Sequence, residues 1–181
     1  MARGRSKSKS KKIRPRSWVF CEGESEDAYV SFLRSKYRSP TVIVSKVAGA
    51  GIKESYIRHY KKDNGGSHPK DKTFLFYDGD MQDVLNNIER IKKTNMLITT
   101  PCLEYWFLLH YKDCNDAMVS DSCLRKLKEV NPEYKKGEIN SSLQQVFDSS
   151  IEKACERAKQ TVIPENPSSN IYKLIDELMK T

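Results

Sequence analysis

The sequence predicts an α/β fold in which a mostly parallel, four-stranded sheet is flanked by helices and followed by a helical C-terminal part. Two observations lead to this prediction. Short apolar runs of the kind that form buried strands alternate with stretches whose apolar residues recur every three or four positions. Strands and helices that alternate in this way usually give a parallel-rich sheet with helices on both faces.

The alternating pattern begins at Ser17. Residues 17–21 are wholly apolar after the opening serine, which is typical of a buried strand, and residues 26–37 have apolar side chains at helical spacing. The same two signals recur further along the chain. Further strands are expected at 41–47, 73–77 and 96–99, and further helices at 52–62, 81–93 and 102–110.

The rest of the chain is predicted to be helical. Residues 102–110 are apolar nearly all round, so this helix should be buried. Helices are then expected at 121–130, 139–159 and 169–179, with Pro164 and Pro167 interrupting the last two. Residues 17–181 are therefore expected to form a single domain with a helical extension over about 121–181.

The positive charge of the chain is concentrated at its beginning. The 181 residues include 32 Lys and Arg against 24 Asp and Glu, which gives a formal charge of +8. Residues 1–16 hold all of this excess, so they are expected to form a disordered basic arm. Two interpretations stay open: a solubilising tail, or a nucleic-acid-binding arm that seeks phosphates. Its basic residues are Arg3, Arg5, Lys7, Lys9, Lys11, Lys12, Arg14 and Arg16.

Several classes of protein are excluded by composition. The longest apolar run, 106–109, is far shorter than the ~20 residues that cross a bilayer, and the basic N-terminus has no apolar segment behind it. The five cysteines form no CxxC pair, so no zinc spacing is present. The mean hydropathy of −0.69 indicates a polar protein with no membrane partner. The odd number of cysteines fits a reducing compartment, so a cytoplasmic location is predicted.

Acidic residues follow three of the predicted strands. Glu22 follows the first, Asp78 and Asp80 follow the strand ending at Tyr77, and Glu104 comes shortly after the fourth. Each motif alone could be only a turn or a helix-start charge. Together, however, they should meet at one edge of the sheet, where carboxylates repel one another unless a cation offsets them. Their hard oxygen ligands predict a site for Mg²⁺ or Mn²⁺.

The acidic motifs resemble a known family. Residues 19–26 (VFCEGESE), 76–80 (FYDGD) and 101–110 (PCLEYWFLLH), with 166–171 (NPSSNI), resemble the RloB-like family. That resemblance implies a Toprim-like domain and an association with bacterial anti-phage defence and abortive infection. It implies metal-binding and catalytic roles for Glu22, Asp78, Asp80 and Glu104.

A metal-dependent nuclease is the function that this resemblance favours. It would hydrolyse phosphodiester bonds of RNA or DNA as a defence effector. The alternative is a non-catalytic Toprim-like module that binds nucleic acid or a protein partner encoded in the same defence operon. The oligomeric state stays open. Candidate supporting residues for the site are Glu26, His110, Lys136 and Lys159.

Overall fold

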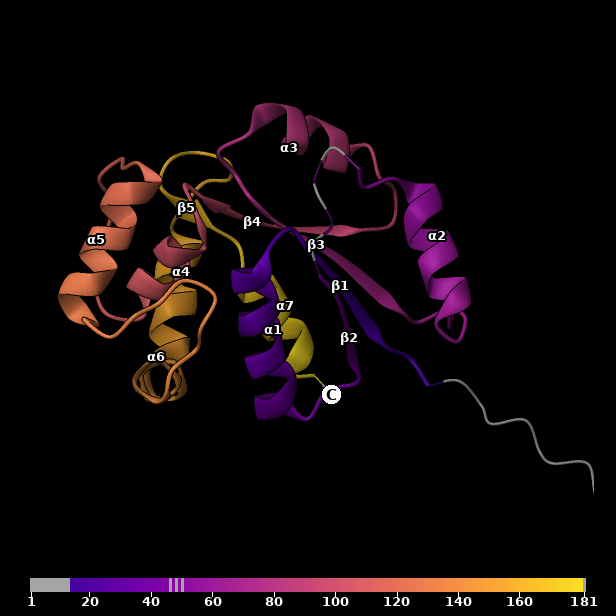
Figure 1. The fold of residues 1–181 in the computed structure, drawn as a ribbon, viewed down its shortest axis with the longest axis horizontal. Helices are drawn as coiled ribbons and strands as arrows, with labels where there is room; N and C mark the ends of the chain where they lie inside the picture. The colour runs from indigo at the N-terminus through magenta and orange to yellow at the C-terminus, as the bar shows by residue number, and fades with distance from the viewer. Residues whose placement is uncertain (1–13, 46, 48, 50, 181) are drawn as a thin grey trace, which may run out of the picture.

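The structure is a computed structural model that describes residues 14–180 except 46, 48 and 50. Its described part confirms the α/β prediction, with a mostly parallel sheet flanked by helices (Figure 1). The strands are β1 (Ser17–Cys21), β2 (Thr41–Val44), β3 (Lys72–Asp78), β4 (Asn95–Thr100) and β5 (Ser168–Ser169). The helices are α1 (Glu24–Tyr37), α2 (Glu54–Asp63), α3 (Gln82–Glu89), α4 (Leu103–Leu109), α5 (Ser120–Val130), α6 (Ser141–Lys159) and α7 (Tyr172–Leu178).

The order of the strands determines where a ligand site can form. The sheet runs β2-β1-β3-β4-β5, and β1 pairs in parallel with both β2 and β3. The chain therefore passes from β1 to β2 on one side and then crosses to β3 on the other side of β1. Such a reversal of direction leaves a crevice at the carboxyl ends of the two central strands, where open α/β sheets bind their ligands. In this protein the crevice lies between the ends of β1 and β3.

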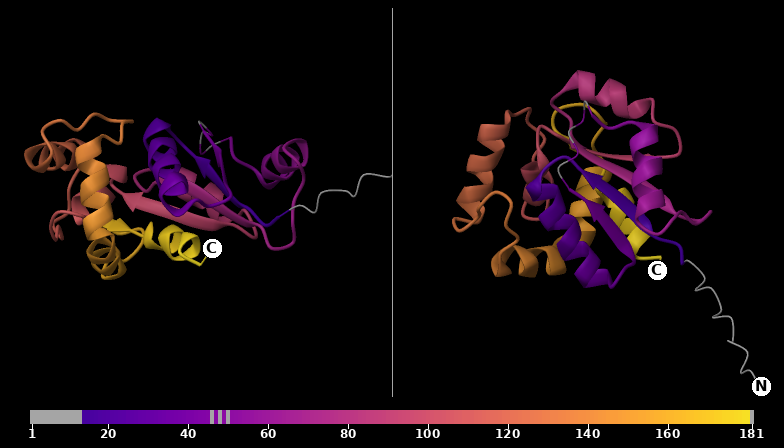
Figure 2. Two further views of the ribbon diagram at one scale, coloured as in Figure 1. Left: turned by 90° about the horizontal axis from the view of Figure 1, so that it is seen from below. Right: turned by 45° about the vertical axis from the view of Figure 1, so that its right-hand side comes forward.

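Each face of the sheet has its own hydrophobic core, because successive strand residues point to opposite faces. Val19 and Phe76 belong to the core covered by α1, α4, α6 and α7. Phe20 and Leu75 belong to the core covered by α2 and α3. Figure 2 shows helices on both faces of the sheet, as the alternating pattern predicts.

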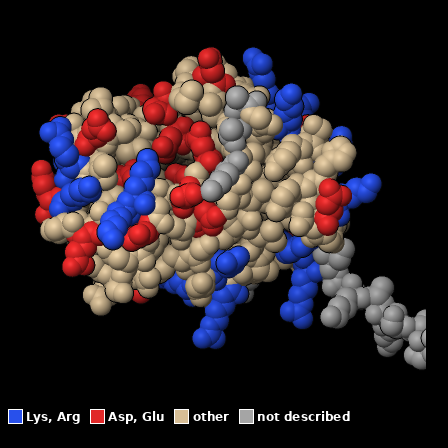
Figure 3. Space-filling model, viewed as in Figure 1, with Lys and Arg blue, Asp and Glu red and all other residues tan. Residues whose placement is uncertain are grey.

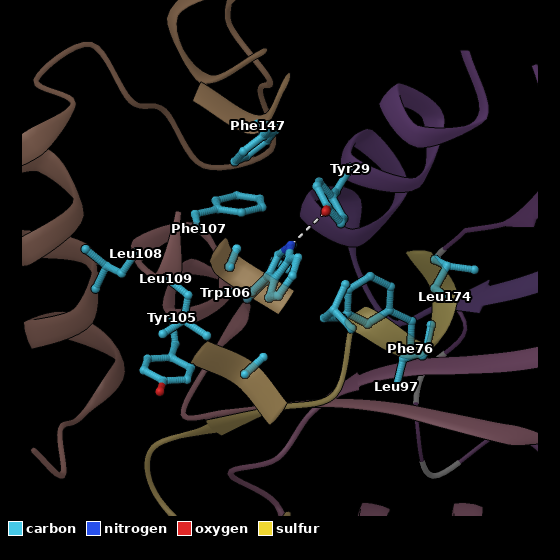
Figure 4. Packing of buried hydrophobic residues seen from close by; sticks show 14 of the residues in the cluster. Tyr29, Phe76, Leu97, Tyr105, Trp106, Phe107, Leu108, Leu109, Phe147 and Leu174 are labelled. Carbon is cyan, nitrogen blue, oxygen red and sulfur yellow. Dashed lines mark hydrogen bonds between the residues drawn. The ribbon is translucent and has the colours of Figure 1, made fainter. Parts of the chain in front are cut away.

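The buried helix α4 joins the sheet to the C-terminal helices. All seven of its residues are buried, as its apolar sequence predicts. The Trp106 indole donates a hydrogen bond of 2.7 Å to the Tyr29 hydroxyl of α1, and Phe107 packs between Tyr29 and Phe147 of α6 (Figure 4). Helix α4 is therefore fixed against α1 and α6. None of the helices in the described ranges has the length and apolar character needed to cross a bilayer.

The sheet has a fifth strand that the sequence pattern did not indicate. Helix α7 begins at Tyr172, whereas the periodic pattern predicts a helix from residue 169. The two preceding serines, Ser168 and Ser169, pair antiparallel with Thr100 and Thr99 of β4. Asn170 continues this edge through its side chain. The side-chain Nδ2 donates to the Met96 carbonyl at 3.1 Å, and the side-chain Oδ1 accepts from the Ile98 backbone amide at 2.7 Å. These hydrogen bonds between distant parts of the chain outweigh the helical preference of the local sequence.

Smaller differences concern element ends. Strand β2 ends at Val44, three residues before the predicted end, and α1 begins at Glu24, two residues before the predicted start.

Arg16 is anchored to the domain, whereas the sequence assigned it to a disordered arm. Its guanidinium group donates hydrogen bonds to the carbonyls of Asn64 at 3.1 Å and Gly66 at 2.6 Å. The same group lies 4.4 Å from the centre of the Trp18 ring, a favourable cation–π distance. Arg16 therefore has a structural role. Arg14 and Pro15 are exposed, and residues 1–13 of the predicted arm lie outside the described residues.

Replacing Asn170 with alanine should destabilise the protein. Asn170 is 5% exposed, and its loss would leave the buried Ile98 amide without an acceptor. We expect a decrease of about 1–3 kcal/mol in the free energy of unfolding, measured by urea denaturation. The matched control is Asn86→Ala on the exposed surface of α3, where a change within about 0.5 kcal/mol is expected. Equal effects of the two substitutions would contradict the edge-pairing role of Asn170.

Candidate metal centre

Glu22 and Asp78 meet at the carboxyl ends of the two central strands, β1 and β3. Glu22 comes directly after β1, and its backbone amide still donates to the Phe76 carbonyl of β3 at 3.1 Å. The backbone amide of Asp78, the last residue of β3, donates to a Glu22 carboxylate oxygen at 3.3 Å. The pairing of β1 with β3 thus brings together two acids that lie 56 residues apart in the sequence.

The second acid of the DxD motif, Asp80, is exposed at the end of the turn after Asp78. The turn is tight because the Gly79 amide donates to the Thr99 carbonyl of β4 at 2.9 Å. A Cβ atom at Gly79 would collide with the Thr100 side chain, so only glycine fits between the two aspartates. One Asp78 carboxylate oxygen, Oδ1, is buried without a hydrogen-bond partner.

Two further acids reach the same place from helix N-termini. Glu104 lies in the first turn of α4 and is 2% exposed, and Glu26 lies in the first turn of α1 and is 6% exposed. One Glu104 oxygen accepts a hydrogen bond of 2.8 Å from the Tyr134 hydroxyl, and one Glu26 oxygen accepts from the Gly23 amide at 3.0 Å. We call Glu22, Glu26, Asp78, Asp80 and Glu104 the acidic cluster.

Burial and mutual repulsion disfavour negative charge in the acidic cluster. Burial raises the pKa of Asp78 to about 8, and the charges of Glu26, Glu104, Asp80 and Glu22 add to this effect. Burial also raises the pKa of Glu22, with a contribution from Asp80 that opposes the lowering effect of the Asp78 amide. The pKa of Glu26 is raised by burial and by Glu22 and Glu104, against the lowering effect of backbone hydrogen bonds. The five carboxyl groups therefore form one electrostatically coupled group.

Of the predicted supporting residues, Glu26 and Lys136 belong to this site. Lys136 is exposed on the connection between α5 and α6, and the negative charge of Glu104, followed by those of Asp78 and Glu26, raises its pKa. The Lys136 ammonium group therefore offsets part of the charge of the acidic cluster. Tyr134, two residues earlier, also reaches the site; it stands in a charged connection with no periodic pattern that would have revealed it.

His110 and Lys159 lie elsewhere. His110 is buried beside α6, where its ring pairs with Ser150 at 3.0 Å and packs against Phe147. Burial lowers the pKa of His110 to about 3, with Lys36 and Arg157 contributing, so the ring stays neutral. Lys159 at the end of α6 is 4.0 Å from Asp176 of α7. The structure thus places these two residues in the packing of the C-terminal helices.

The acidic cluster fits a divalent cation in its ligand chemistry. Its donors are hard carboxylate oxygens, and the buried, unpartnered Asp78 oxygen could accept a cation. No group of three or more His, Cys, Asp or Glu side chains with the geometry of a metal site occurs among the described residues. The evidence for a cation at this position is therefore the charge and burial of the carboxyl groups.

Acidic side chains also gather in space on one face of the molecule. Figure 3 shows Asp and Glu around a hollow on this face, with Lys and Arg spread mainly over the surrounding surface. Acidic side chains therefore border a hollow on this face of the molecule.

The family model for RloB-like proteins matches residues 18–178, which is most of the chain. The chain belongs to the RloB-like protein family. Neither the curated proteins nor the solved structures include a match to this RloB-like chain. The matched region contains the complete acidic cluster together with Tyr134 and Lys136.

Replacing Asp78 with asparagine should stabilise the protein at neutral pH in metal-free buffer. In the folded state Asp78 keeps its proton up to about pH 8, whereas the unfolded chain loses it near pH 4. The folded state then binds more protons, so the Asp78 contribution to stability falls as the pH rises from about 4 to 8. Asparagine has no ionisable proton, so Asp78→Asn removes this loss of stability at higher pH.

The gain should be near zero at about pH 4 and reach about 1–3 kcal/mol above pH 8. Urea denaturation of both proteins across this pH range, with a chelator present, measures it. Asp83→Asn on the exposed side of α3 is the control and should lack this pH-dependent gain. A variant less stable than wild type at pH 8 would contradict the repulsion in the acidic cluster.

Proposed function

We propose that this protein is a metal-dependent nuclease that hydrolyses phosphodiester bonds of RNA or DNA, with Mg²⁺ or Mn²⁺ as its cofactor. The observation that supports this proposal most directly is the acidic cluster at the ends of β1 and β3, where burial, together with repulsion between the acids, raises the pKa values of Glu22 and Asp78. Clustered carboxylates at such a crevice are the usual ligands of the cations that catalyse phosphoryl transfer.

The roles of the residues follow from their positions. Glu22, Asp78, Asp80 and Glu104 would hold the ion, which supplies a Lewis acid for the phosphate and lowers the pKa of a bound water. Asp78 would release its proton when a cation binds, so metal affinity should rise with pH. Lys136, exposed beside the cluster, would bind a non-bridging phosphate oxygen and offset its charge.

A biological role as an effector of bacterial anti-phage defence is part of this proposal, and it rests on the resemblance of the sequence motifs. In that role the nuclease would act on nucleic acid in the cytoplasm, together with any protein partner of a defence operon.

The alternative function is a Toprim-like module that binds nucleic acid or a partner without cleaving it. The concentration of basic residues at positions 3–16 favours this alternative, since phosphate contacts can supply affinity without catalysis. The two functions differ in whether the acidic cluster binds a metal ion and takes part in cleavage.

Cleavage of mixed RNA and DNA substrates in Mn²⁺ tests the nuclease. Asp78→Ala and Glu22→Ala should each lower the rate by roughly 100-fold or more, because each removes a proposed metal ligand. Asp83→Ala is the matched control. It removes an exposed acid three residues after Asp80, and the variant should cleave like the wild type. Activity that is unchanged in both cluster variants would refute the assignment.

Calorimetry with Mn²⁺ distinguishes the two functions. Metal binding by the wild type and its loss in Asp78→Ala would support the nuclease. Tight, salt-sensitive binding of RNA or DNA without any metal binding would support the alternative.

A further inference from the structure

The connection between α5 and α6, residues 131–140, reaches the acidic cluster from the helical extension. Tyr134 bonds to Glu104 of α4, and a Cβ at Gly137 would lie 3.9 Å from the Glu24 Cβ at the start of α1. In Figure 1 this connection runs from the end of α5 toward the α1 side of the molecule. The Tyr134 hydrogen bond therefore holds the segment beside the cluster, and the Gly137 backbone passes close to the start of α1.

The Tyr134 side chain is enclosed at this position. It is 2% exposed, and its ring packs edge-on against Phe107, with ring centres 6.1 Å apart. Its hydroxyl, the donor, is 2.8 Å from Glu104 Oε1, which is as short as a strong O–H···O hydrogen bond. Since Glu104 is itself 2% exposed, water cannot readily replace this donor.

Glu104 needs such an anchor to act with the other acids. It comes from α4, whereas Glu22 and Asp78 come from the sheet, and its negative charge is repelled by theirs. A free Glu104 side chain would relieve the repulsion by turning away. A donor on one oxygen holds the carboxylate in place beside the other acids.

We infer that Tyr134 is a positioning residue that holds Glu104 beside the other acids of the cluster, where Glu104 would bind the proposed metal ion. The inference rests on the proposed metal-dependent function and adds a residue from the helical extension to the site. Tyr134 acts through its hydroxyl on Glu104 and does not touch the ion. The C-terminal helices are therefore part of the functional site, because they present Tyr134.

The test is the affinity of the full-length protein for Mn²⁺, measured by calorimetry on Tyr134→Phe. This variant keeps the ring that packs on Phe107 and removes only the hydroxyl. We expect the affinity to fall by about 10-fold. Tyr105→Phe is the matched control, because the Tyr105 hydroxyl is buried without a hydrogen-bond partner. Its affinity should equal that of the wild type.

A second measurement shows whether Tyr134 acts through Glu104. In the Glu104→Gln background, the further change Tyr134→Phe should alter Mn²⁺ affinity by less than about 2-fold, because the two effects are coupled. An undiminished 10-fold loss in that background would overturn the inference, as would equal affinities of Tyr134→Phe and Tyr105→Phe. If either of these two results is obtained while the wild type binds Mn²⁺, only the positioning role of Tyr134 fails. If the wild type binds no Mn²⁺, both the positioning role and the proposed metal-dependent function fail.

Discussion

The parallel pairing of β1 with β3 is the constraint on which the candidate metal site depends. It places Glu22 beside the Asp78 amide and confines two carboxyl groups to one crevice. Burial there makes the charged forms costly, and the pKa of Asp78 rises to about 8. Gathering acids at this position lowers the stability of the folded protein in the absence of a cation. The repulsion is the physical basis for expecting a cation.

The two hydrophobic cores serve this arrangement in different ways. The core beneath α2 and α3 supports the strands, whereas the core beneath α1 and α4 also orients two acids, Glu26 and Glu104. The hydrogen bond between Trp106 and Tyr29 holds α1 and α4 together. Because each of these helices carries an acid in its first turn, their packing determines how the acids approach the sheet.

The helical extension contributes polar contacts to the acidic cluster as well as packing. Its α5–α6 connection supplies Tyr134, a buried donor, and Lys136, an exposed cation, to the acids at the sheet edge. The site is thus built from both parts of the domain. The basic N-terminal segment enters the domain at Arg16, which is bound to the loop after α2, at the end of β1 opposite Glu22.

The sequence by itself determined strands β1 to β4, the helices and the acids that follow the strands, because hydrophobic periodicity and motif spacing are local signals. It also led to the RloB-like family through its acidic motifs. The tertiary structure decided which candidates meet. Glu26 belongs to the acidic cluster and Lys136 lies beside it, whereas His110 packs against α6. Strand β5 and the Tyr134 contact depend on partners about 70 and 30 residues away, so no local pattern encodes them.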